Sequence, residues 1–263
     1  LSQIDATIAK LENAKLEKVT DKDPLGAWAK LKNAKPGSVA TQLQAMRKDY
    51  EEGTAQNEKV KVAATFYADL RDQASYDKWF KSGNGLGSEV SPAGSFALAA
   101  DGEKAFTGIY PAGIYSHLIS DKHNGFLSSV FHLAKGERNS IRAMGSGSFA
   151  RFPIRSYPLT HGGLHPAAPL KPKMNWVSLK KYKYWNGEKG YYQISTGADS
   201  TSQKSDGPER SWFGVFEVYA GNDSMLELGA PIVALPGKLD AITDREALLD
   251  YYRKSLKAAV TNW

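Results

Sequence analysis

The sequence predicts a mainly β protein with helical ends, in which a β-sandwich or jelly roll packs against N- and C-terminal helices. Two observations predict it. Between Ile109 and Tyr157, short apolar runs alternate with glycine, asparagine, aspartate and lysine, as in strands that are joined by turns. Residues 1–81 and the stretch after Thr243 instead repeat apolar side chains at helical spacing.

The N-terminal region is expected to be helical over residues 1–81. Leu1, Ile4, Ile8 and Leu11 lie on one face of a helix. Asp23 followed by Pro24 is typical of a helix start, because an aspartate caps the first turn and proline fits its first position. Further helices are expected from Ser38 to Tyr50 and from Lys59 to Gln73, with a polar break at residues 53–57 between them.

Glycine-rich residues 82–87 read as a hinge, after which the β-sandwich is expected over residues 88–234. Asp101-Gly102 is the clearest hairpin signal of the chain. Pro153 favours an edge strand or a bulge, because proline cannot donate to the ladder. The expected strands are 95–99, 104–110, 126–133, 140–144, 149–157, 175–179, 191–196 and 212–218.

The C-terminal helix is expected over residues 240–263. Thr243 and Glu246 have the spacing of a capping box. Leu249, Tyr252, Leu256 and Val260 then form one apolar stripe. A single stripe has to be buried against another element, and we expect this helix to pack on the N-terminal helices.

Composition excludes several classes of site. The 263 residues include no cysteine, which excludes disulfides, thiolate zinc sites, cysteine nucleophiles and covalent haem attachment. The sequence has no run of eighteen apolar residues, so no membrane insertion is expected. The net charge of +6 favours an anionic partner over a cationic one, and no nucleic-acid-binding motif is present.

Several segments carry a resemblance to a known family. They are Gly113–His117, Ser120–Gly125, Leu127–Phe131, Met144–Gly147, Tyr157-Pro158, Trp185–Gly187 and Ser211–Gly214. Together they resemble the middle segment of large secreted planctomycete proteins, which often begin with a cytochrome c domain and place this segment between two domains of unknown function. The order of strands is also similar to galactose-binding-like sandwiches that accompany glycan-active enzymes. The resemblance implies a secreted or periplasmic location and adjacent domains in the parent protein. Separately, the start at Leu1 without a signal peptide leads us to expect an excised or processed fragment.

Arginines and aromatic residues on the strands are the candidate ligand-binding residues. Arg151, Arg155 and Tyr157 share one face of their strand, opposite Phe152 and Ile154. Guanidinium groups bind carboxylates and sulfates in bidentate fashion, and aromatic rings stack on sugars. The candidates are Arg142, Arg151, Arg155, Tyr157, Trp176, Tyr184 and Trp185. The alternative is that the arginines form salt bridges and the aromatic residues fill the core.

The histidines and acidic loops are weaker candidates. His117, Asp121 and His123 would be metal ligands or would hydrogen-bond a turn, and the turn is preferred. Ser116 beside His117 lacks the constrained turn of a nucleophile. Asp199, Asp206 and Glu209 are weak calcium candidates, since their spacing matches no defined calcium loop. No other cofactor is expected.

These features predict a non-catalytic, extracytoplasmic binding module for a polysaccharide that carries sulfate or uronic-acid groups. A structural connector that positions neighbouring domains is the first alternative. An enzyme acting on glycans through the histidines is the second.

Overall fold

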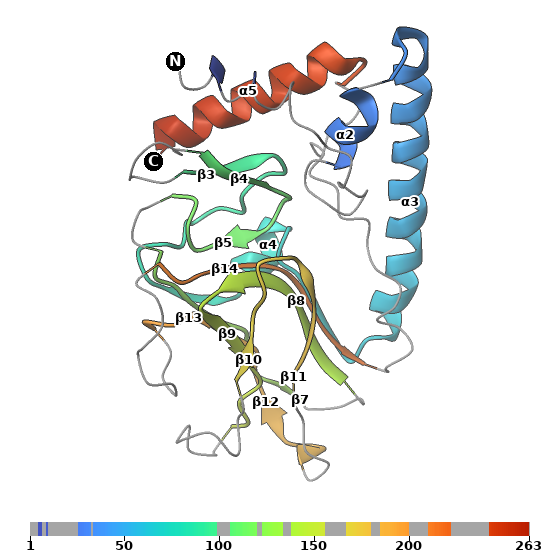
Figure 1. Ribbon diagram of the computed structural model, residues 1–263. Helices are drawn as coiled ribbons and strands as arrows, with labels where there is room; N and C mark the ends of the chain where they lie inside the picture. The colour runs from blue at the N-terminus through green and yellow to red at the C-terminus, as the bar shows by residue number, and fades with distance from the viewer. Residues whose placement is uncertain are drawn as a thin grey trace. The chain divides into compact units, whose positions relative to one another are not determined.

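The computed structural model describes residues 5, 6, 9, 26–32, 34–98, 106–119, 123–133, 138–155, 167–179, 185–199, 210–221 and 242–262 (Figure 1). The chain divides into two compact units. One consists of Leu1–Glu58, Pro92–Ala112 and Leu228–Trp263, and the other of Lys59–Ser91 and Gly113–Glu227.

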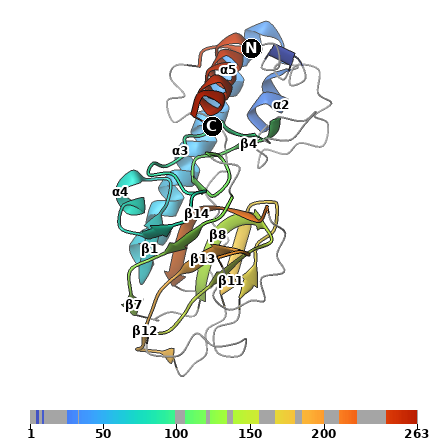
Figure 2. The ribbon, with the colours of Figure 1, turned by 90° about the vertical axis from the view of Figure 1, so that its left-hand side faces the viewer.

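The second unit is a β-sandwich of two five-stranded sheets with antiparallel pairing (Figure 2). The first sheet has the order β1 (Phe66–Asp69), β14 (Trp212–Gly221), β8 (Arg138–Ser146) and β11 (Asn175–Leu179), and β5 (Ile114–Tyr115) also pairs with β14. The second sheet has the order β10 (Ala168–Pro169), β9 (Ser148–Arg151), β13 (Gln193–Thr196), β6 (Phe126–Ser128) and β2 (Phe80–Ser82). A two-stranded ribbon of β7 (His132–Leu133) and β12 (Lys189–Gly190) lies at one end of the sandwich.

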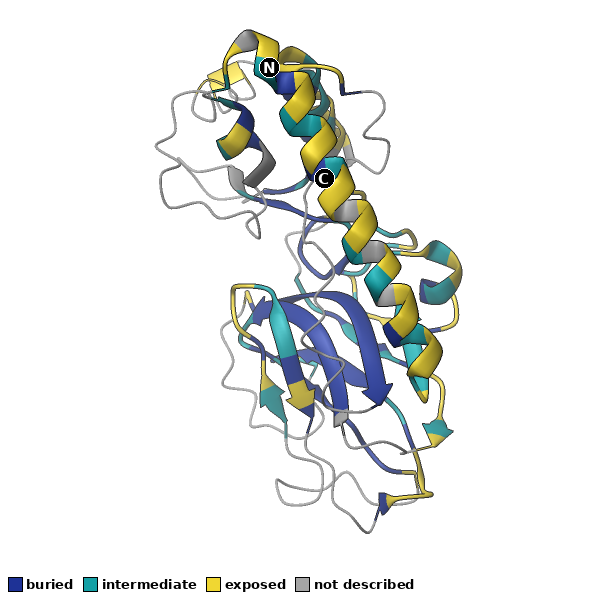
Figure 3. Cartoon of the chain, turned by 90° about the vertical axis from the view of Figure 1, so that its right-hand side faces the viewer, coloured by how far each residue is buried: buried dark blue, intermediate teal, exposed yellow. Residues whose placement is uncertain are grey.

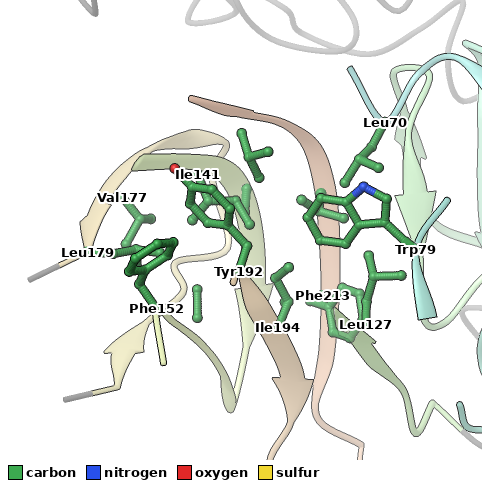
Figure 4. Packing of buried hydrophobic residues seen from close by; sticks show 14 of the residues in the cluster. Leu70, Trp79, Leu127, Ile141, Phe152, Val177, Leu179, Tyr192, Ile194 and Phe213 are labelled. Atoms are coloured by element: carbon green, nitrogen blue, oxygen red, sulfur yellow. The ribbon is translucent and has the colours of Figure 1, made fainter. Parts of the chain in front are cut away.

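The core of the sandwich lies between the two sheets (Figure 4). Successive side chains of a strand point to opposite faces, so every second residue enters this core. Ile141, Val177 and Val215 come from the first sheet, and Leu127 and Ile194 from the second. The short helix α4 (Gln73–Tyr76), capped by the Asp72 carboxylate on the Ser75 amide, adds the buried ring of Tyr76 to the same core.

Gly147 separates the two sheets in the sequence. β8 ends at Ser146 in the first sheet and β9 begins at Ser148 in the second, so the chain changes sheets across this single residue. Gly147 has a φ of 61°, in the left-handed region that glycine adopts without the steric penalty of a Cβ atom. Gly147 thus lies, with a left-handed conformation, at the point where the chain passes from the first sheet to the second.

The first unit contains the helices α2 (Gly26–Lys32) and α5 (Arg245–Asn262), the 3₁₀ turn η1 (Pro36–Ser38) and the antiparallel pair β3 (Ser95–Leu98) and β4 (Phe106–Tyr110). The helix α3 (Val39–Ala63) begins in this unit and ends in the other. The core residues of this unit are Trp28, Leu31, Val39, Met46, Phe96, Ile109, Ile242, Leu248, Leu249, Tyr252 and Leu256. Residues of α2, α3 and α5 therefore share one core with the β3–β4 pair.

The mainly β fold with a sandwich and helical ends is confirmed, but several expected elements differ. α3 is one helix, with no break at residues 53–57. A glycine inside a helix costs only about 1 kcal/mol relative to alanine, and the exposed pairs Arg47–Glu51 and Lys48–Glu52 at i,i+4 support the neighbouring turns. The helix expected over residues 59–73 ends at Ala63, and residues 66–69 form the edge strand β1.

Two further expectations are corrected. The β3–β4 pair was counted in the sandwich over residues 88–234, but it lies in the other unit, where β3 contacts α5. The first turn of α5 is capped by Asp244, whose Oδ1 accepts a hydrogen bond from Ala247 N at 2.8 Å, so Thr243 is not the capping residue. The cap therefore lies one residue later than expected, and its carboxylate satisfies the free amide of Ala247.

No helix in the described part of the chain is long and apolar enough to cross a membrane.

Candidate functional site

The outer face of the second sheet carries polar side chains that are buried. Because Ala150 and Ile194 point into the core, Arg151, Gln193 and Ser195 point to the other side of the sheet. Arg151 and Gln193 are direct cross-strand partners in β9 and β13. All three side chains are about 1% exposed. These three side chains therefore form a buried polar row on the face of the second sheet that lies opposite its core face.

Gln193 is the most informative residue of this row. Among the described residues, neither its Oε1 nor its Nε2 has a hydrogen-bond partner, although both atoms are buried. Ser195 Oγ is also buried and has no hydrogen-bond partner among the described residues. A buried polar group without a partner costs about 1–3 kcal/mol, so a ligand that hydrogen-bonds to this amide would recover that free energy. An amide carries one acceptor and two donors, which suits a group that both donates and accepts.

Aromatic side chains flank the polar row. Ser195 of β13 is opposite Phe149 of β9 on one side and Phe126 of β6 on the other, so these rings lie on the same face. On the edge strand β2, Phe80 is 62% exposed, and its ring contacts that of Phe126 at 6.1 Å between centroids. The outer face of the second sheet thus combines apolar rings with amide, hydroxyl and guanidinium groups.

The outer face of the first sheet is instead occupied by an internal charge network. Arg142 of β8 and Glu217 of β14 are cross-strand partners, and Arg142 Nη1 lies 2.8 Å from Glu217 Oε1. The hydroxyl of Tyr67 donates to Glu217 Oε2 at 2.6 Å. Burial and the negative charge of Glu217 raise the pKa of Tyr67, so this hydroxyl stays protonated and remains a donor. The guanidinium of Arg142 therefore has a carboxylate partner within the protein.

A second ion pair extends the network towards solvent. Arg71 donates from Nε and Nη2 to the two carboxylate oxygens of Asp69, at 2.7 and 2.8 Å. Burial opposes the ionisation of Asp69, but the hydrogen bonds and charge of Arg71 outweigh it and lower the pKa of this carboxyl. Val60, in the last turns of α3, packs with Tyr219 and Trp176 beside these charges. The network stabilises the fold and leaves little free charge for a ligand.

The predicted binding residues do not form one surface. Arg151 and Arg155 share a face of their segment as predicted, since Phe152 and Ile154 lie in the core. Arg142 lies on the first sheet, so the expected row of three guanidinium groups on neighbouring strands is wrong, because Gly147 sends β8 and β9 into different layers.

The predicted aromatic residues are dispersed as well. Trp185 is fully buried in the core, where it fills space between the sheets and has no face for a ligand. Trp176 is half-buried beside Arg142, whose guanidinium lies 5.9 Å from the indole centroid. Tyr157 and Tyr184 lie outside the described residues.

The histidines take part in aromatic packing. His117 stacks on Trp212 at 4.1 Å between ring centroids, and its ring lies 5.8 Å from that of His123. Burial, with a smaller contribution from His123, lowers the pKa of His117 to about 3, so it is neutral at physiological pH. His132 stacks on Phe66 with 3.8 Å between ring centroids, in a different group of aromatic contacts from His117 and His123. Burial lowers the pKa of His132 to about 4. Asp121, His161 and His165 lie outside the described residues.

In the described part of the chain, neither the nucleophile candidate Ser116 nor the calcium candidates form a catalytic or metal-binding site. Ser116 Oγ is fully buried and accepts a hydrogen bond from the backbone amide of Phe213 at 3.0 Å, which ties β5 to β14. Asp199 accepts a hydrogen bond from the Thr196 hydroxyl at 2.6 Å, and Asp206 and Glu209 lie outside the described residues. Over the described ranges, no group of three or more histidine or acidic side chains is placed to hold a metal ion.

Gln193 and the rings around it were not predicted from the sequence. The signal was the alternation of residues 191–196, in which the large apolar side chains Tyr192 and Ile194 occupy every second position. That pattern places Tyr191, Gln193 and Ser195 together on the opposite face. What the pattern does not contain is the burial of Gln193 without a partner, which only the fold reveals.

Comparison with known proteins identifies no family. No protein-family model and no curated protein sequence matches this chain. Among solved structures, a family two carbohydrate esterase from Cellvibrio japonicus aligns with 54% of this chain at 13% identity, with a TM-score of 0.24. The aligned part spans 33% of that esterase. A TM-score of 0.24 does not establish a shared fold.

Proposed function

We propose that this protein is a non-catalytic polysaccharide-binding module and that the outer face of its second sheet holds the ligand. The observation that carries the proposal is the buried amide of Gln193, which has no hydrogen-bond partner among the described residues and lies opposite Arg151 in the sheet. Such a group is stabilised by a ligand with adjacent donors and acceptors.

A sugar matches the chemistry of this face. Hydroxyl groups both donate and accept, as the Gln193 amide and the Ser195 hydroxyl require. The C–H faces of a sugar ring are apolar and pack on aromatic rings, which Phe126, Phe149 and the exposed Phe80 supply. Binding sites generally combine apolar walls with a few polar groups that fix orientation, and this face has that composition.

The positive charge of the protein supports a polysaccharide with negative groups. The net charge is +6, and Arg151 and Arg155 lie on the same side of their segment as Gln193. Sulfate and uronic-acid groups both suit a guanidinium fork. The resemblance to secreted planctomycete proteins supports a location outside the cytoplasm, beside further domains of a longer protein.

Binding to immobilised polysaccharides tests the proposal. The wild-type chain should be retarded in gels that contain polygalacturonate or dextran sulfate, and Gln193→Leu should lose at least about tenfold in affinity, because one satisfied buried amide is worth about 1–3 kcal/mol. Gln56→Leu is the matched control, since Gln56 lies on α3 in the other unit. If wild type binds none of these polysaccharides, or if Gln193→Leu binds them as wild type does, the proposal is wrong.

A structural connector is the second candidate, and one observation favours it. The boundary between the two compact units falls between Glu58 and Lys59, inside α3. The middle turns of α3 are largely exposed and polar (Figure 3). A helix that is polar all round is typical of solvent-exposed bridges between domains. If this is the role, two helix-breaking prolines in the middle of α3 should uncouple the thermal unfolding of the units, and wild type should bind none of the polysaccharides.

A further inference from the structure

The outer face of the second sheet continues beyond Gln193 towards an exposed aromatic patch. Tyr191 lies two residues before Gln193, and burial raises the pKa of its hydroxyl while the charge of Arg151 lowers it. The ring of Tyr191 packs against that of Phe131 at 5.1 Å between centroids. The guanidinium of Arg155 lies 5.6 Å from the centre of the Phe131 ring. These contacts form a line of three side chains: Tyr191, Phe131 and Arg155.

The far end of this line is exposed and apolar. Phe131 is 51% exposed, and its neighbours Val130 and Leu133 are 55% and 41% exposed. Isolated apolar residues are ordinary on a protein surface, but adjacent ones with an aromatic ring at the centre indicate a binding surface. The backbone holds them in place, since Leu133 of β7 pairs with Lys189 of β12 and Arg155 N donates to Lys189 O at 2.7 Å.

Among the described residues, Arg155 has no carboxylate partner, unlike Arg142. The ion pairs of the described side chains include none with Arg155, whereas Arg142 is neutralised by Glu217 at 2.8 Å. Arg155 is exposed at the rim of the patch. A guanidinium beside an aromatic ring offers two contacts at once, a bidentate fork for an anion and a flat apolar surface for the ring that bears it.

We propose that Phe131, Tyr191 and Arg155 form a second subsite for a sugar with a negatively charged substituent. This sugar lies further along the same polysaccharide than the sugar bound at Gln193. The proposal rests on the proposed function and deepens it. Arg155 binds the carboxylate or sulfate, and Phe131 packs on the sugar ring. The Gln193 subsite contributes hydrogen bonds to hydroxyl groups. A ligand that fills both subsites is a polymer or a long oligosaccharide, so the module recognises the interior of an acidic chain.

The experiment compares charged and neutral polymers of matched backbone. Isothermal titrations are run with polygalacturonate, its methyl ester, dextran sulfate and neutral dextran. Wild type should bind an acidic polymer about tenfold more tightly than its neutral counterpart at low salt, and Arg155→Gln should remove most of this preference. Phe131→Ala should weaken binding to the acidic polymer by a similar factor. A preference for polygalacturonate identifies a carboxylate as the ligand group, and one for dextran sulfate identifies a sulfate.

Matched variants separate this proposal from the proposed function. Lys189→Gln removes one positive charge next to the patch without removing the fork of Arg155, and it should retain most of the preference. Val62→Ala removes an exposed apolar side chain on α3 and should change nothing. If Gln193→Leu abolishes binding while Arg155→Gln and Phe131→Ala bind as wild type does, the second subsite is wrong and the proposed function stands. If none of the polymers binds, both are wrong.

A second copy of this chain is the competing occupant of the patch. Sedimentation at increasing protein concentration detects it. A dimer that dissociates in Phe131→Ala, with no dependence on the polymer, would overturn the subsite. A wild-type chain that stays monomeric and gains a ligand-dependent signal supports it.

Discussion

Arg142 and Glu217 form an ion pair inside the protein, with 2.8 Å between Nη1 and Oε1 and side chains that are only 5% and 4% exposed. The pair joins the adjacent strands β8 and β14 on the outer face of the first sheet. Tyr67 and Arg71 also contact the Glu217 carboxylate, at 2.6 and 3.5 Å. Both oxygens of the Glu217 carboxylate therefore have partners within the protein.

Removing one partner of this pair is expected to destabilise the protein. Glu217→Ala leaves the Arg142 guanidinium buried without its carboxylate, a change that typically costs about 3–5 kcal/mol. Denaturant unfolding measures the effect. Polysaccharide binding at temperatures where the variant remains folded should be unchanged. Arg142→Ala that kept full stability but lost ligand affinity would show that Arg142 belongs to the binding site.

Acid should weaken the protein through its buried histidines. The pKa of His117 is lowered to about 3 in the folded protein and lies near 6.5 when the chain is unfolded, so the unfolded state binds more protons between these values. The stability that neutral His117 contributes is present above about pH 6.5 and is lost as the pH falls towards 3. His117→Phe keeps a ring on Trp212 and should reduce the slope of stability against pH by up to about 1.4 kcal/mol per pH unit.

His132→Phe is a second test of the acid effect. The pH range over which His132 reduces stability is narrower than for His117, because the pKa of His132 in the folded protein is lowered to about 4. Unfolding free energies measured from pH 7 to pH 4 compare the two variants with wild type. A pH dependence that neither substitution changes would show that the histidines are not the source. Stoichiometric zinc in wild type that is lost in His117→Phe would show a metal site in place of aromatic packing.

Gly147 should tolerate asparagine better than alanine or valine. Its φ of 61° lies in the left-handed region, which costs most residues about 1–2 kcal/mol and asparagine less. Gly147→Val should therefore lower the free energy of unfolding by at least this amount, whereas Gly147→Asn should lower it by less. Thermal unfolding ranks the stabilities of the Gly147 variants. Equal stability for both variants would mean that the change of sheets does not depend on this conformation.

Strong local patterns predicted the strands of the sandwich, but they did not predict which strands pair over long distances in the sequence. β11 coincides with the expected strand 175–179, because its residues alternate cleanly between the core and the outside. The burial of Phe152 and Ile154 opposite Arg151 follows from the same alternation. The strand β1 was missed because its four residues follow a helix directly and pair with β14, some 150 positions away. Local periodicity contains no information on such partners.

The candidate site was predicted only in part, for the same reason. Arg151 and Arg155 were identified because strand parity relates them within one segment. Arg142 was added because its strand is adjacent in sequence, but Gly147 places it in the other sheet. Trp185 was read as an exposed ring, although the burial of a tryptophan depends on the packing of distant strands. Gln193 looked like an ordinary polar position, since a missing hydrogen-bond partner is a property of the folded neighbourhood.

The central claim is that the Gln193 amide takes part in binding, and the side-chain amide resonance of Gln193 in solution NMR tests it most directly. Asn139 is the internal control, because its amide is also buried and without a partner among the described residues, but it follows the core parity of Ile141 in β8. The two resonances are assigned by their loss in Gln193→Leu and Asn139→Leu. On titration with polygalacturonate or dextran sulfate oligosaccharides, the Gln193 signal should shift and the Asn139 signal should stay. A titration in which bound sugar leaves Gln193 unmoved while residues of the first sheet shift would contradict the account.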